Sequence, residues 1–285
     1  MDQRQFIGRR LTNVFQSFLL LIAMLGLMVL VGYILAGPSG IRWTLFFGAI
    51  LFFLAPRLSA KLTLRSYRAR ELGHGEAPGL YTIVDDLARK AHLSPSPRVA
   101  YIPTDIANAF SVGSKGNAYI ALSDGLLRSL NHRELRAVLA HELSHIVHND
   151  MGVMAMADII SRVTSMVSLV GQFLLLLNLP LLVMGGATIP WLLILILILS
   201  PTVAGLLQLA LSRTREFDAD NEAAALTGDP KALASALEKM EIKQKSLFQH
   251  VFLPMRKDPT PSILRTHPIT EERIRRLLSL EKPRE

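Results

Sequence analysis

Two long stretches of the chain carry no charged residue, and they limit the folds that the chain can adopt. Leu11–Ile41 and Val163–Ser212 contain no Asp, Glu, Lys or Arg. A helix that crosses the roughly 30 Å hydrocarbon core of a bilayer needs about 20 consecutive, mainly apolar residues. The first stretch therefore predicts one membrane helix. The second predicts two, with a turn between them near Asn178–Pro180 and Gly185-Gly186.

A shorter apolar run, Trp43–Ala55, follows the first stretch after a tight turn predicted at Gly37–Gly40. The run is short for a full crossing, although Arg42 and Arg57 at its ends could extend toward the lipid headgroups. We predict that it forms a fourth membrane helix. The alternative is a re-entrant or interfacial segment, which would put the N-terminus and the polar part of the chain on opposite sides of the membrane.

The rest of the chain has the mixed polarity of a domain in water. Short strands are predicted at Arg98–Ile102 and Ala118–Leu122, with a hairpin that turns at Ser114–Asn117. We therefore expect a mostly α-helical polytopic membrane protein with about four transmembrane helices. Helix pairs at 1–56 and 159–211 would anchor one α+β domain, which is built from 57–158 and 212–285 and contains a small sheet.

Positive charge is concentrated beside the apolar stretches. The net charge is +8, and basic residues gather at 4–10, 57–70 and 213–215, whereas the turns between paired helices have almost none. The positive-inside rule then places both termini and the polar domain in the cytoplasm, with the helices in the plasma or inner membrane. No nucleic-acid-binding motif accompanies the charge, so nucleic acid is not an expected partner. The absence of cysteine excludes disulfides and thiolate metal ligands.

The sequence His141-Glu142-Leu143-Ser144-His145 has the spacing of a zinc site. Residues four apart lie on one face of an α-helix, about 6 Å from each other, so the two histidines can bind one metal ion. Glu142 is placed to take a proton from the attacking water, as in hydrolytic enzymes with the HExxH pattern.

A helix is predicted to carry this motif. Asn131 followed three residues later by Glu134 is a capping-box pattern, and apolar residues at helical spacing follow it. Arg133 and Arg136 make this helix too polar to lie inside a bilayer, which argues against an intramembrane protease. A transporter is not favoured either, because Val163–Ser212 holds no ionisable residue.

A catalytic zinc ion needs a third protein ligand. Glu216 and Asp220 are again four residues apart, just after the last apolar stretch. One carboxylate can bind the metal while the other accepts the free N–H of a ligand histidine. His148, three residues after His145, is a weaker alternative ligand. An ordinary solvated acidic helix face would explain the same two carboxylates without any metal.

Four motifs together resemble the HtpX family of membrane-bound zinc endopeptidases, relatives of the CAAX prenyl-protein endopeptidases. They are Asn108-Ala109-Phe110, His141–His145 with Asp150 after it, Ser212–Asp220, and Thr266-His267-Pro268. The resemblance covers nearly the whole chain and implies a zincin-like metalloprotease domain. It also implies one zinc ion per chain bound by His141, His145 and Glu216, with Glu142 as the catalytic base and Asp220 and Asp150 supporting the ligands.

The resemblance further implies a cytoplasmic active site that cuts misfolded or damaged membrane proteins. Polypeptides and the lipid bilayer are therefore the expected partners. His267 and Arg213 are candidates to stabilise the oxyanion beside the metal. The main rival from another class is a membrane scaffold or inactive pseudoprotease, because a sequence does not reveal turnover.

A substrate-binding segment is also expected. Asn108, Ala109 and Phe110, together with Asn117 and Ala118, could offer an edge strand to which an extended peptide adds by main-chain hydrogen bonds. Such binding would select unfolded segments rather than a particular sequence. The alternative is an ordinary covered hairpin.

Overall fold

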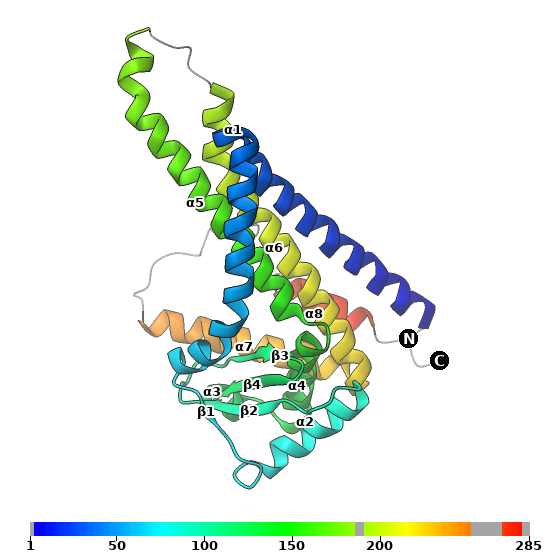
Figure 1. Cartoon of the computed structure of the whole chain (residues 1–285). Helices are drawn as coiled ribbons and strands as arrows, with labels where there is room; N and C mark the ends of the chain where they lie inside the picture. Colours follow the sequence, from blue (N-terminus) through cyan, green and yellow to red (C-terminus); the bar gives the residue numbers. More distant parts are fainter. Residues whose placement is uncertain (1–2, 186–190, 252–269, 281–285) are drawn as a thin grey trace. The chain divides into compact units, whose positions relative to one another are not determined.

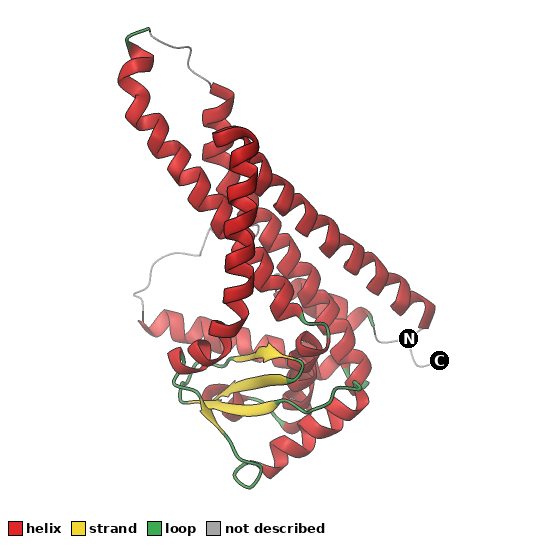
Figure 2. Cartoon of the chain, in the orientation of Figure 1, coloured by secondary structure: helices red, strands yellow, loops and turns green. Residues whose placement is uncertain are grey.

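The computed structural model describes residues 3–185, 191–251 and 270–280. The chain forms two compact units. The apolar unit comprises Val14–Ala55 and Val153–Ser212, and the site unit comprises Met1–Asn13, Pro56–Gly152 and Arg213–Glu285. Helices dominate the chain, and one small sheet lies in the site unit (Figure 1, Figure 2).

Three long helices supply the apolar unit: α1 (Gln3–Ser66), α5 (Asp150–Val183) and α6 (Trp191–Thr227). Each contains a segment that is long and apolar enough to cross a membrane. Large apolar side chains such as Phe15 and Phe173 are exposed, which suits contact with lipid. The predicted fold class, a mostly helical membrane protein with a small sheet, is confirmed. Three helices contain these segments, and α1 consists of two helices joined across a kink, so the predicted N-terminal helix pair corresponds to its two arms.

The bend in α1 lies at Ala36 and Gly37, at the start of the predicted turn. Both residues have non-helical backbone angles, and Gly37 has a φ of +56°, which glycine adopts without strain. The two arms approach closely beside the bend, since a Cβ at Gly40 would lie 1.9 Å from the carbonyl oxygen of Gly32. Trp43–Ala55 belongs to the second arm, and its crossing of a membrane stays a prediction.

Pro201 lies inside α6 and leaves one backbone carbonyl without its usual helical donor. Proline has no N–H, so the carbonyl of Leu197, four residues earlier, loses its helical hydrogen bond. Gln172 of α5 donates to this carbonyl at 3.0 Å, and the hydroxyls of Ser168 and Ser200 also donate to it. Inside a membrane no water is available to replace these donors. They therefore satisfy the carbonyl and join α5 to α6.

The turn predicted at Asn178–Pro180 is wrong. α5 runs through Pro180 to Val183, and Asn178 donates from Nδ2 to a backbone carbonyl one turn earlier, at 2.8 Å. Pro180 removes a single N–H close to the end of the helix, and the helix continues past it for three residues. The chain turns at Gly185, whose φ is +79°, and Gly186 lies outside the described residues.

The site unit contains a four-stranded sheet in the order β1-β2-β4-β3. Its strands are β1 (Arg70–Glu71), β2 (Arg98–Ile102), β3 (Ala109–Ser114) and β4 (Asn117–Ser123). β3 and β4 form the predicted hairpin, with Ser114 opposite Asn117. β2 and β4 pair in parallel, with Val99 opposite Ile120. β3 therefore lies at an edge of the sheet, as the prediction for substrate binding requires.

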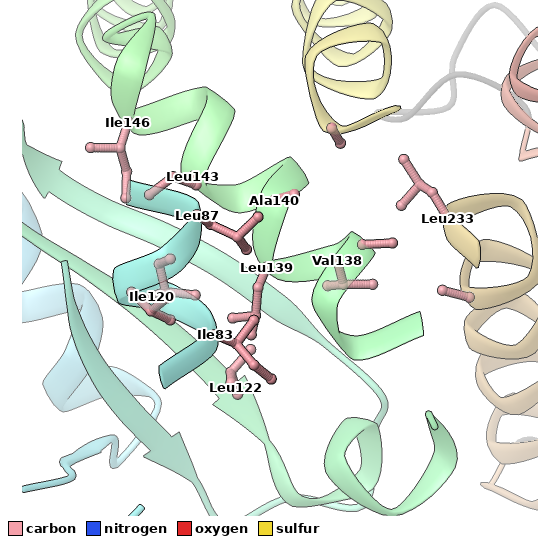
Figure 3. Close-up of a cluster of buried hydrophobic side chains, with 14 of the residues drawn as sticks. Ile83, Leu87, Ile120, Leu122, Val138, Leu139, Ala140, Leu143, Ile146 and Leu233 are labelled. Carbon is pink, nitrogen blue, oxygen red and sulfur yellow. The ribbon is translucent and has the colours of Figure 1, made fainter. Parts of the chain in front are cut away.

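Among the described residues, five helices lie wholly within the site unit, and the last part of α6 also belongs to it. The five are α2 (Pro78–Lys90), α3 (Asp124–Ser129), α4 (His132–Val147), α7 (Pro230–Val251) and α8 (Thr270–Ser279). Figure 3 shows how apolar side chains of α4 pack against α2, β4 and α7. The buried residues in this contact include Leu139, Leu143 and Ile146 of α4, Ile83 and Leu87 of α2, Ile120 and Leu122 of β4, and Leu233 of α7. The helix that carries the HExxH motif is thus held on its apolar side by a close-packed core.

The start of α4 is fixed by the predicted capping box. Asn131 Oδ1 accepts from the amide of Glu134 at 3.0 Å, and Glu134 Oε2 accepts from the amide of Asn131 at 2.9 Å. The Glu134 carboxylate also accepts from Ser235 at 2.7 Å and from Lys239 at 2.8 Å, both on α7. One carboxylate therefore caps α4 and ties it to α7.

The contacts of Glu134 predict a pH-dependent stability. Burial raises the pKa of Glu134, but hydrogen bonds from Lys239, the Asn131 amide and Ser235 outweigh it and lower this pKa below 4.5. A carboxylate whose pKa is lower in the folded than in the unfolded state stabilises the fold above its unfolded pKa. That contribution is lost as the pH falls through the folded-state pKa.

We expect Glu134→Gln to lower the unfolding temperature by a few degrees at neutral pH, and by less when the pH lies well below 4.5. Thermal unfolding followed by circular dichroism measures this difference. Glu238→Gln, which changes an exposed carboxylate of α7, is the matched control and should have little effect. An equal loss for Glu134→Gln at both pH values would contradict the prediction.

The shared carbonyl of Leu197 predicts that Gln172 and Pro201 are energetically coupled. Gln172→Leu removes a donor and should reduce the free energy of unfolding by about 1 kcal/mol. In Pro201→Ala the backbone N–H of residue 201 returns, so the same Gln172 change should cost less. A double-mutant cycle, measured by unfolding in mixed detergent micelles, tests this coupling. Strictly additive losses would show that the carbonyl does not link the two residues.

Candidate metal centre

Three donor side chains meet between α4 and α6 in the site unit. His141 Nε2 lies 3.2 Å from His145 Nε2 and 3.5 Å from Glu216 Oε2, and His145 Nε2 lies 3.8 Å from Glu216 Oε1. Each of the three side chains is no more than 14% exposed. The four-residue spacing puts both imidazoles on one face of α4, and α6 supplies the carboxylate opposite them. The structure thus brings together the three residues predicted to bind metal.

The spacing and chemistry of this group fit a divalent metal ion such as zinc. Zinc binds imidazole nitrogen and carboxylate oxygen at about 2.0–2.2 Å in a tetrahedron, which puts neighbouring ligand atoms about 3.3–3.6 Å apart. The donor atoms of these three side chains all lie within 4.8 Å of one another, and three of their separations are 3.2, 3.5 and 3.8 Å. Three protein ligands of this kind are typical of catalytic zinc sites, whereas structural sites use four.

A buried aspartate lies against the other ring nitrogen of each histidine. Asp220 Oδ1 is 3.0 Å from His141 Nδ1, and Asp150 Oδ2 is 2.8 Å from His145 Nδ1. Each aspartate accepts the Nδ1 hydrogen and thereby leaves the Nε2 lone pair of its histidine directed at the donor group. The two residues predicted to support the ligands therefore lie where that role requires.

Arg273 of α8 also reaches the donor group. Its Nε and Nη2 atoms donate to the two oxygens of Asp220 at 2.8 and 2.7 Å, and its Nη1 lies 2.8 Å from Glu216 Oε2. The guanidinium is buried and joins the proposed third ligand to the aspartate behind His141. Sequence reasoning missed this residue, because nothing in the pattern of α8 separates Arg273 from its neighbours Arg275 and Arg276.

These contacts shift the titration of the buried groups. Burial lowers the pKa of His141, but the hydrogen bonds that the ring donates to Asp220 and Glu216 raise this pKa more, to about 10. Burial raises the pKa of Glu216 and of Asp220. The contacts with His141 and Arg273 lower the pKa of both carboxyls by a larger amount. Both therefore stay anionic at neutral pH, as a metal-binding carboxylate and its partner must.

The remaining predicted residues of the reaction lie in different places. Glu142 follows His141 on α4, and its side chain is buried. Arg213 lies on α6, three residues before Glu216 and half-buried. His267 lies outside the described residues. His148 directs its Nδ1 at the carbonyl oxygen of Ser144, 2.9 Å away, and does not belong to the donor group, so the alternative third ligand is not supported.

The predicted substrate-binding residues lie on the β3–β4 hairpin. Ala109 and Phe110 belong to edge strand β3, and Asn117 and Ala118 begin β4. The carbonyl of Asn108, just before β3, accepts from the amide of Ser123 at 3.0 Å, which fixes the start of the edge strand. β3 also packs against α4, the helix of the two histidines.

Comparison with known proteins gives one family match and several relatives of similar sequence. Residues 75–281 match peptidase family M48. A protease HtpX homolog of Thermococcus sibiricus is 38% identical over 283 residues, covering 93% of this chain and 94% of the relative. A protease HtpX homolog of Persephonella marina is 36% identical, covering 95% and 98%. A third, from Aquifex aeolicus, is 35% identical and covers 90% and 89%.

A solved structure also has a similar fold. The crystal structure of S. mikatae Ste24p matches with a TM-score of 0.51 and 21% sequence identity. The match covers 95% of this chain and 66% of the Ste24p chain, so this chain spans about two thirds of that longer protein. At this level of identity the likeness concerns the fold alone.

Proposed function

Because the chain belongs to the HtpX proteases of peptidase family M48, and is thus a membrane-bound metalloendopeptidase, we propose that its metal is a single zinc ion held by His141, His145 and Glu216. The observation that carries this proposal is the convergence of two imidazole Nε2 atoms and one carboxylate, with each Nδ1 committed to a buried aspartate. This donor set matches catalytic zinc in type and number.

Glu142 is the proposed catalytic base. When bound, zinc lowers the pKa of a coordinated water toward about 7 and polarises the carbonyl of the peptide bond. Glu142, next to His141, takes the proton of the attacking water and returns it to the leaving amine. Asp150 and Asp220 hold the histidine rings in the orientation that presents Nε2 to the metal. Arg213 and His267 are the candidates to stabilise the oxyanion.

Substrate is proposed to bind by strand addition to β3. An edge strand presents unpaired N–H and C=O groups, and an extended polypeptide can add to them without regard to its side chains. β3 supports this role because it lies at the sheet edge and packs on the helix of the ligand histidines. An enzyme that reads main chain in this way acts on unfolded segments, which is the property that quality control of damaged membrane proteins needs.

The proposed site of action is the cytoplasmic face of the plasma or inner membrane. The basic residues at 57–70 and 213–215 flank apolar helices, and the positive-inside rule assigns such flanks to the cytoplasm. Glu216 follows the charge-free stretch that ends at Ser212 by only four residues of α6. Polypeptide that leaves the bilayer on this side is therefore the proposed substrate.

Glu142→Gln tests the reaction. The amide keeps the shape of the side chain but cannot take a proton, so we expect cleavage of an unfolded protein such as casein to fall by at least 100-fold. Zinc content, measured by elemental analysis of the protein in detergent, should stay at one ion per chain. Glu216→Gln should instead lose the zinc. Glu222→Gln, farther along α6, is the matched control and should keep both metal and activity.

Two outcomes would contradict this assignment. A Glu142→Gln variant that cuts as fast as the wild type would remove the proposed base. A wild type that binds no zinc and cleaves nothing would favour the non-catalytic scaffold. Circular dichroism of each protein shows independently whether it is folded, so neither result can be attributed to unfolding.

The orientation has its own test. A phosphatase reporter, active only outside the cytoplasm, and a fluorescent reporter, active inside it, can each be fused after Glu285. We expect fluorescence and no phosphatase activity, because the positive charges beside the helices retain the C-terminus in the cytoplasm. The reverse pattern would contradict the proposed cytoplasmic orientation, and the proposed mechanism of hydrolysis would remain unaffected.

A further inference from the structure

Asp150 has a second partner besides the proposed ligand His145. One carboxylate oxygen, Oδ2, lies 2.8 Å from His145 Nδ1, and the other, Oδ1, forms an ion pair with Arg215 Nε at 2.8 Å. The side chains of Arg215 and Asp150 are only 8% and 4% exposed. Water and salt therefore screen this ion pair little.

Arg215 is itself held from its other side. Its Nη2 atom lies 3.4 Å from Oδ2 of Asp218, one turn further along α6. Asp218 in turn accepts a hydrogen bond at Oδ1 from Nδ2 of Asn13 in α1. The guanidinium thus bridges two buried carboxylates, and the second carboxylate is anchored independently of the metal donors.

A buried carboxylate without a charged partner is strongly unfavourable, and the surrounding side chains move to relieve it. Without Arg215, Asp150 would lose the charge that fixes one of its oxygens and would be free to turn. The hydrogen bond to His145 Nδ1 depends on the direction of the other oxygen. Turning would weaken this bond and let the imidazole rotate, which moves Nε2 away from the donor group.

The same arrangement occurs behind His141, where Arg273 holds Asp220. Arg273 also contacts Glu216 directly, so its removal would disturb a donor and its support together. Arg215 forms ion pairs with Asp150 and Asp218, and neither aspartate belongs to the candidate donor group. A substitution at Arg215 therefore tests the support of His145 while it leaves all three candidate donor side chains unchanged.

We propose that Arg215 is a positioning residue of the metal centre, which acts through Asp150 to hold His145 in its metal-binding orientation. The proposal rests on the proposed function, since it takes His145 as a ligand. Arg215 contributes to metal affinity without binding the metal, and Asp218 keeps it in place.

The test measures zinc affinity by competition with a chromophoric chelator, in detergent, with every variant made in the Glu142→Gln background. This background removes proteolysis from the readout. We expect Arg215→Met and Asp150→Asn each to weaken zinc binding about 10- to 100-fold. The double variant should bind no more weakly than Asp150→Asn alone, because both changes interrupt one line of support.

Arg136→Met is the matched control. It breaks the ion pair between Arg136 and Asp86, which lies between α4 and α2 in the same unit and involves no metal donor. Zinc affinity should be unchanged in this variant, although its unfolding temperature can fall. Arg215→Lys keeps the charge but lacks the planar guanidinium, so it should recover part of the affinity lost in Arg215→Met.

Three results would overturn the proposal. They are wild-type affinity in a folded Arg215→Met variant, losses at Arg215 and Asp150 that multiply in the double variant, and an equal loss in Arg136→Met. If Arg215→Met alone does not fold, the comparison of Asp150→Asn with the double variant still decides, because removing both members of a buried ion pair is better tolerated than removing one. Absence of zinc binding in the Glu142→Gln parent would instead refute the proposed metal site.

Discussion

The pairing of each proposed ligand histidine with a buried aspartate is the interaction on which the candidate site depends. An imidazole can present either nitrogen to a metal, and its neutral form places one hydrogen on the other nitrogen. Asp220 and Asp150 commit the Nδ1 atoms, so both Nε2 atoms point at Glu216. These aspartates are buried carboxylates, which require cations in turn, and Arg273 and Arg215 provide them. The need to neutralise each buried charge thus extends the site from the HExxH helix to α6 and α8.

The geometry of this network relies on the rigidity of α4. Its apolar side packs in a close-fitting core against α2 and β4, and its first turn is capped by Asn131 and Glu134. Glu134 also binds Lys239, so the same carboxylate that caps α4 secures α7. A helix fixed at its start and along one face keeps two side chains four residues apart in a constant relation. Ordinary packing and capping therefore fix the relative positions of the two histidines in the candidate donor group.

Sequence patterns among neighbouring residues predict much of this arrangement, but they do not predict contacts between residues that are distant in the sequence. The capping box at Asn131 and the β3–β4 hairpin follow from short-range hydrogen bonds, which adjacent residues specify. The triad of His141, His145 and Glu216 was predictable from spacing and family resemblance. The pattern around Pro180 predicts a turn, but the helix continues past it, because proline near a helix end costs only one hydrogen bond. The role of Arg273 depends on where α8 docks, and no local pattern in the sequence encodes that position.

The edge of the sheet also determines where the site unit can lie. Among the described residues β3 pairs with β4 on one side only, so its outer N–H and C=O groups need water or another strand. Lipid offers no hydrogen bonds, and an open sheet edge cannot be exposed to the hydrocarbon core. An open edge of this kind favours a position of the site unit in water and argues against an intramembrane protease. The unpaired edge that favours water over lipid is also the edge to which the proposed substrate would add, so the proposed substrate binding and the proposed position outside lipid depend on the same structural feature.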